Sequence, residues 1–139
     1  MIHRISLIVV LVTLLSAQAP SVPCCNNCET SAQSVDVACL NAKEMRVHVD
    51  HVEPLKPSGL DKGINLAGTV VVEVRFDASG KVACARAKSG HPIAISAAME
   101  AVEKWTFKPL VSNGVAEGGC GLIRIKYRLR DQGSTTKLQ

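Results

Sequence analysis

The sequence predicts an α+β fold: a small antiparallel sheet of three strands with one main amphipathic helix packed on one face. Residues 68–76 and 122–129 alternate apolar and polar side chains, the period of two that half-buried strands show. Residues 92–105 change to the period of a helix. Their apolar side chains fall on one stripe, formed by Ile95, Ala98, Met99, Val102 and Trp105.

Turn and boundary residues divide this pattern into elements. Residues 77–80, Asp-Ala-Ser-Gly, supply a tight turn into a second strand. The step from Val82 to Ala85 in that strand breaks strict alternation and predicts a β-bulge. Pro92 suits the entry to the helix, and Pro109 prevents the chain from continuing as a helix. The expected core residues are Val72, Val74, Phe76, Met99, Val102, Trp105, Phe107 and Pro109.

The first nineteen residues have the pattern of a signal peptide. Arg4 precedes an uncharged apolar stretch, residues 5–17, which is shorter than the roughly 20 residues of a membrane span. Ala17-Gln-Ala19 is a candidate cleavage site. Because Pro20 follows it directly, an uncleaved anchor in the inner membrane is the alternative. We therefore expect an exported protein of the periplasm or cell envelope, with membrane contact only if residues 1–19 are kept.

An even number of cysteines in an exported chain predicts disulfides. Cys84 and Cys120 share the outward face at one end of the sheet and are candidates to pair, although an intervening strand would separate them by roughly 10 Å. A zinc site with Cys25, Cys28, Cys39 and either His48 or His51 as ligands is a weaker alternative, because its spacing is loose and the compartment is oxidising. The disulfide candidates are Cys24, Cys25, Cys28, Cys39, Cys84 and Cys120.

Composition and motifs argue against several classes of function. A net charge of +4 is mild, and one Trp, one Tyr and two Phe provide no platform for stacking bases, so no nucleic-acid partner is expected. Ser89 lacks the G-x-S-x-G elbow of a nucleophile. His91 has the position of a residue that caps the corner before a helix. We expect a protein that is not an enzyme and holds no cofactor or metal.

Several motifs, in this order and spacing, resemble the C-terminal domain of the TonB energy-transducer family. They are Gly68-x-Val70-x-Val72, Ser89-Gly-His-Pro92, Trp105-Thr-Phe-Lys-Pro109 and Ile123-x-Ile-x-Tyr127. The resemblance covers residues 54–131. It implies a small periplasmic domain that grips a short peptide of a partner, an outer-membrane transporter in TonB itself, and a link to TonB-dependent transmembrane transport. The sequence departs from the family at Leu55-Lys-Pro57, which replaces a tyrosine–proline pair, and has no long proline-rich spacer.

Composition and the resemblance together give the expected layout of the chain. Residues 1–19 are the signal peptide or anchor, and residues 20–53 are a cysteine-containing extension with a short extra strand at 46–52. The TonB-like domain, 54–131, opens with a short helical turn at 60–66. Residues 132–139 are expected to form a flexible tail.

The connectivity points to one binding edge. A hairpin, a helix and a strand antiparallel to the first give the sheet order second–first–third, so the third strand has unpaired backbone groups along one side. Such an edge accepts an extended peptide by strand addition. The expected partner-binding residues are Leu122, Ile123, Arg124, Ile125, Lys126, Tyr127 and Arg128.

The uncovered face of the sheet is expected to be basic, opposed mainly by Glu73. Its cations would be Arg75, Arg86, Lys88, Arg124, Lys126 and Arg128. The plain interpretation is a solvated face that keeps the edge from aggregating. The second hypothesis for the whole protein is a disulfide-stabilised envelope protein that self-associates, as a homodimer, through the edge at 122–129.

Overall fold

The computed structural model describes residues 38–58, 65–130 and 133–139. The predicted signal peptide, Cys24, Cys25 and Cys28 lie outside this part of the chain. Within it, no helix has both the length and the apolar character that crossing a membrane requires.

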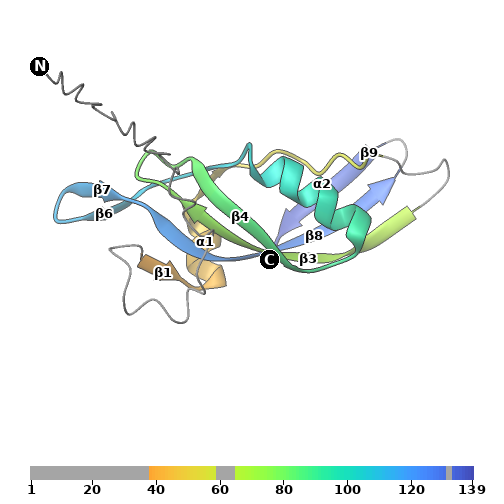
Figure 1. Ribbon diagram of the computed structural model, residues 1–139, viewed down its shortest axis with the longest axis horizontal. Helices are drawn as coiled ribbons and strands as arrows, with labels where there is room; N and C mark the ends of the chain where they lie inside the picture. The colour runs from red at the N-terminus through yellow and green to blue at the C-terminus, as the bar shows by residue number, and fades with distance from the viewer. Residues whose placement is uncertain (1–37, 59–64, 131–132) are drawn as a thin grey trace, which may run out of the picture.

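Short strands and two helices frame two long strands (Figure 1). In chain order the elements are β1 (Ala38–Leu40), α1 (Ala42–His48), β2 (Val49–His51), β3 (Asn65–Phe76), β4 (Val82–Ser89), α2 (Pro92–Val102), β5 (Thr106–Phe107), β6 (Leu110–Ser112), β7 (Val115–Glu117), β8 (Gly119–Arg130) and β9 (Gly133–Leu138).

The main sheet is larger than the predicted three strands. The three expected strands are neighbours, in the order β4–β3–β8, but β8 also pairs on its outer side with β1 and β9. The β1 pairing is parallel and covers residues 119–121, whereas the β9 pairing is antiparallel and covers residues 125–130. Residues 133–138 are therefore a strand, and the expectation of a flexible tail at 132–139 is wrong for them. Their run of Gly, Ser and Thr has too few apolar side chains to give a strand period.

The segment before the domain also differs from the prediction. Residues 46–52 were expected as a strand, but only Val49–His51 is one, and α1 precedes it. A capping box starts α1: the Asn41 side chain accepts from the backbone N–H of Glu44 at 3.0 Å, and Glu44 Oε2 accepts from Asn41 N at 2.8 Å. The residues of this capping box, 41–44, precede residues 46–52, whose alternation predicted a strand.

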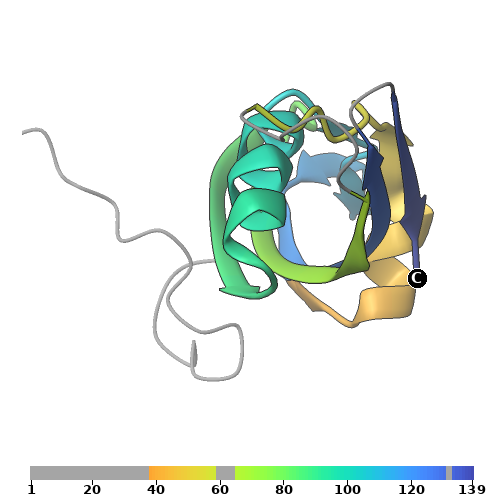
Figure 2. The ribbon, with the colours of Figure 1, turned by 90° about the vertical axis from the view of Figure 1, so that its right-hand side faces the viewer.

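Helix α2 packs on one face of the sheet as predicted, but with a different stripe (Figure 2). Its buried residues are Ala94, Ala97, Ala98, Ala101 and Val102, whereas Ile95 and Met99 are half-buried. Methyl side chains let the helix approach the strands closely, so the alanines face the sheet. The helix ends at Val102, and Trp105 is buried in the connection beyond it. His91 caps its start, because His91 Nδ1 accepts from Ile93 N at 3.3 Å.

Most of the predicted core is buried. This holds for Val72, Val74, Phe76, Val102, Trp105 and Phe107, while Met99 and Pro109 are half-buried. The rings of Phe76 and Phe107 stack with centroids 4.8 Å apart. Met45 and Leu55, which lie outside the predicted strands and helix, are fully buried as well.

The hairpin between β3 and β4 confirms the predicted turn and bulge. Asp77 Oδ1 accepts from Ser79 N at 2.8 Å and from Lys81 N at 3.1 Å, and the hydrogen bonds from Ser79 hold the pKa of Asp77 below 3.8. The register steps from Arg75↔Cys84 to Phe76↔Val82, which leaves one extra residue in β4. Of the expected helical turn at 60–66, residues 65 and 66 are part of β3 and the rest lie outside the described residues.

Candidate functional site: the outer edge of strand β8

Strand β8 separates apolar from polar side chains with a strict period of two. Among the seven predicted partner-binding residues, Ile123, Ile125 and Tyr127 are buried in the core, whereas the others point outward and are exposed. Their partner strand β3 is in register with β8 along its whole length, from Asn65↔Arg130 to Phe76↔Gly119. One side of β8 is therefore fixed by a long ladder and by the core beneath it.

The other side of β8 is occupied along most of its length, so the prediction of an unpaired edge is wrong for residues 125–129. Strand β9 pairs with residues 125–130, from Ile125↔Leu138 to Arg130↔Gly133, and β1 pairs with residues 119–121. Beyond β9, Gln139 N donates to Arg124 O at 3.0 Å. The sequence missed this because β9 has no clear strand period. Self-association through a bare β8 edge, the second hypothesis, meets the same obstacle.

That last hydrogen bond reveals which way the backbone of β8 points. In an antiparallel strand the N–H and C=O of one residue point to the same neighbour, and successive residues alternate between neighbours. Because Arg124 O faces the β9 side, the backbone groups of Lys126 and Arg128 face that side too. The groups of Ile125 and Tyr127 face β3. A ligand strand that replaced β9 would therefore bond to the residues whose side chains are exposed.

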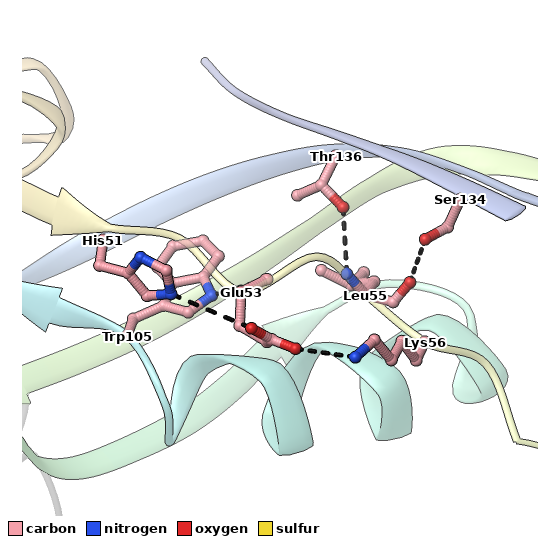
Figure 3. A network of polar contacts seen from close by, with 7 residues as sticks. All are labelled: His51, Glu53, Leu55, Lys56, Trp105, Ser134 and Thr136. Carbon is pink, nitrogen blue, oxygen red and sulfur yellow. Dashed lines mark hydrogen bonds and ion pairs between the residues drawn. The ribbon is translucent and has the colours of Figure 1, made fainter.

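Apart from its ladder with β8, few side-chain contacts hold β9 in place. Its half-buried side chains are Ser134, Thr136 and Leu138, of which only the last is apolar. Residues 53–58, which we call the strap, run between α2 and β9, as Figure 3 shows. In the strap, Leu55 N donates to Thr136 Oγ1 at 3.2 Å, and Ser134 Oγ donates to Leu55 O.

The strap is anchored more firmly on its other side. Leu55 is fully buried, and Trp105 Nε1 donates to Glu53 O at 2.9 Å. The side chain of Glu53 also accepts from Lys56 Nζ at 2.9 Å, and this hydrogen bond lowers the pKa of Glu53 (Figure 3). The strap therefore belongs to the core, whereas β9 touches it through two hydroxyl groups.

The comparisons agree with this architecture. A family model described as Gram-negative bacterial TonB protein C-terminal matches residues 62–137, more than half of the chain. The chain belongs to this family. The match runs from β3 into β9, so β9 is part of the family's domain. Comparison with curated proteins and with solved structures returned no match.

Membership of the TonB C-terminal family carries three consequences. The family is non-enzymatic, which confirms the prediction that this protein is not an enzyme. Its C-terminal domain is typical of envelope proteins that face the periplasm. The family implies a TonB-like role in energy transduction, with outer-membrane transporters as its partners.

The outer face of this TonB-type sheet contains one buried carboxylate. Glu73 is 2% exposed and forms an ion pair with Lys88, with Nζ and Oε2 3.2 Å apart. It lies in register with Arg86 on β4 and Leu122 on β8. The expected basic face is thus divided: Glu73 forms an ion pair with Lys88 and stands opposite Arg86 on β4, whereas its register partner on β8 is the apolar Leu122.

The described cysteines form a row across the same face. Arg75 is in register with Cys84 on one side and with Cys120 on the other, and Cys39 is in register with Cys120. Cys84 and Cys120 are both disulfide-bonded. Because β3 lies between them, their Cα atoms are separated by roughly two strand spacings, about 10 Å. That exceeds the span of a disulfide, about 7 Å, so the geometry disfavours a bond between these two.

The histidines have structural partners. His48 Nδ1 lies 2.9 Å from Lys108 O, and His51 Nε2 lies 4.0 Å from Glu53 Oε2. Within residues 38–58, 65–130 and 133–139 no group of three His, Cys, Asp or Glu side chains is placed to hold a metal ion. Ser89 is exposed at the end of β4.

Burial of Tyr127 makes the domain sensitive to alkaline pH. Desolvation raises the pKa of Tyr127 above its ordinary value of 10.0. The unfolded chain therefore releases this proton first as the pH rises, and stability that is fully present below pH 10 falls above it. We expect the melting temperature of the wild type to decline above about pH 10. Tyr127→Phe should remove part of that decline; equal declines in both proteins would contradict this account.

Proposed function

We propose that this domain binds an extended peptide of a partner protein by strand addition to β8, in the place that β9 occupies here. The observation that carries the proposal is the contrast between the two sides of β8. The β3 side is a ladder of full length over a buried core, whereas the β9 side holds six residues with one half-buried apolar side chain. A segment with few buried apolar contacts opens at low free-energy cost. Displacing β9 therefore costs less than opening the ladder between β3 and β8.

The exchange conserves the hydrogen bonds of β8. An incoming strand would bond to the backbone groups of Lys126 and Arg128 that β9 leaves. Main-chain bonds give affinity without demanding a particular sequence, and the exposed side chains of β8 supply selection. The partner that the family suggests is an outer-membrane transporter, and the compartment is the periplasm.

The experiment uses the full chain and peptides selected on it from a displayed library. Leu138→Ser weakens the packing of β9 against the core and changes no residue of β8, so β9 is displaced from β8 in a larger fraction of the molecules. Because the apparent Kd is the intrinsic Kd divided by the open fraction, peptide affinity should rise several-fold. A matched control, Val111→Ser, changes an apolar residue on the β6 strand, 73% exposed, and should leave affinity unchanged.

A second variant blocks the edge itself. Lys126→Pro removes one N–H from the β9 side and restrains φ, while the β3 ladder and the core side chains remain. Peptide affinity should fall at least about tenfold, which is about 1.4 kcal/mol. If Leu138→Ser weakens capture, the peptide binds the outer side of β9 instead. If neither variant changes the affinity for the peptide, strand addition at this edge is not the function.

A further inference from the structure

A basic hollow lies on the outer face where β3, β8 and β9 meet. Its volume is about 350 Å³, within the range of small-ligand sites. Each of the three strands contributes to it. The lining residues are Ala67, Gly68, Lys126, Tyr127, Arg128, Thr135 and Lys137.

The register explains why the surface is hollowed here. Arg128 stands between Ala67 on β3 and Thr135 on β9, two small neighbours that leave space beside its guanidinium group. In the next row, Lys126 stands directly opposite Lys137. Thr135 adds a hydroxyl group that can donate to a ligand.

The charge of the hollow is uncompensated. Three cations line it, Lys126, Arg128 and Lys137, and its lining includes no carboxylate. Across residues 38–58, 65–130 and 133–139 the ion pairs are His51–Glu53, Lys56–Glu53 and Lys88–Glu73, none of which involves these cations. Like charges directly opposite each other destabilise a strand pair. The contact between β8 and β9 is therefore weakened by the pair Lys126 and Lys137.

We propose that the hollow binds a phosphate group, and that this ligand holds β9 on β8. A ligand with two negative charges matches three cations better than a single carboxylate, and guanidinium and ammonium groups with a hydroxyl are common phosphate ligands. The bound phosphate would neutralise the repulsion between Lys126 and Lys137 and bridge the two strands. The site is complete only while β9 is paired with β8, because Thr135 and Lys137 belong to β9 and leave with it.

This site regulates the peptide edge. A ligand that binds one of two states stabilises that state by mass action. Phosphate would keep β9 in place and reduce peptide capture. The reduced capture of peptide rests on the proposed function. The binding of phosphate and the tighter pairing of β9 with β8 do not rest on it, because both are measured with no peptide present.

The test follows hydrogen exchange at the amides of Thr135 and Lys137 in the full chain, with pyrophosphate as the probe. At ten times its Kd, pyrophosphate should slow exchange about tenfold, whereas acetate at equal ionic strength should not. Lys137→Gln should slow exchange about two- to threefold without ligand, because it removes the repulsion, and weaken pyrophosphate binding at least about tenfold. Arg86→Gln, on β4 outside the hollow, should change neither.

A second arm distinguishes the source of the phosphate. Vesicles of phosphatidylcholine with phosphatidic acid, whose headgroup is a phosphate monoester, are sedimented with the protein. Slower exchange with pyrophosphate supports a soluble ligand, and vesicle binding that Lys137→Gln abolishes supports a lipid. The proposal is overturned if neither probe binds, if Lys137→Gln leaves binding intact, or if exchange responds to ionic strength alone.

Discussion

Replacing Trp105 with alanine should leave little folded protein. The side chain is 1% exposed at the junction of α2, the sheet and the strap, and its Nε1 donates to Glu53 O at 2.9 Å. Truncating a buried aromatic of this size costs about 3–5 kcal/mol of unfolding free energy, comparable to the whole stability of a small domain. Urea denaturation followed by circular dichroism measures it.

Two results would qualify the role of Trp105. Trp105→Phe keeps one aromatic ring but loses the hydrogen bond to the strap and the second ring of the indole, so it should cost less than Trp105→Ala, about 1–3 kcal/mol. A Trp105→Ala protein that melts within a degree or two of wild type would show that the core is not built around this side chain.

Replacing Gly80 with alanine should be nearly as damaging, for a different reason. Gly80 has φ of +81°, and a Cβ there would lie 1.9 Å from the carbonyl oxygen of Phe107. The same backbones are joined by the hydrogen bond from Phe107 N to Gly80 O, 2.7 Å long. Alanine therefore adds left-handed strain and pushes β5 away from the turn, at a cost of about 3 kcal/mol or more.

A second glycine separates these two effects. Gly114, in the β6–β7 turn, has φ of +78° and no atom within 4 Å of a built Cβ. Gly114→Ala should cost only the left-handed strain, about 1–2 kcal/mol. Thermal melts of the two variants give the comparison. Equal losses would mean that the contact with Phe107 contributes nothing.

The occupied edge of β8 changes how substitutions there should be interpreted. A proline at Lys126 affects both the β9 contact and any strand that takes its place, because both use the same backbone groups. Loosening β9 at Leu138 acts in the opposite direction on peptide affinity. The pair of variants thus separates a peptide that replaces β9 from one that adds to its outer side.

The sequence by itself determined the elements whose signals are local. Alternation defined β3 and β8, the turn at 77–80 and the step after Val82 defined the hairpin and its bulge, and Pro92 marked the start of α2. Ordered motifs were enough to identify the TonB C-terminal family. These features could be predicted because each depends on residues a few positions apart.

Only the tertiary structure decided what covers the edge of β8 and which residues complete the core. Ser134 and Thr136 are inward positions of a strand because the strap, about 80 residues earlier in the chain, offers the backbone of Leu55 to their hydroxyl groups. Met45 is buried because Gly121 leaves room for it. The hollow likewise exists because Ala67 and Thr135, small residues far apart in the chain, are brought to either side of Arg128. Such contacts join distant segments, and no local period of apolar residues records them.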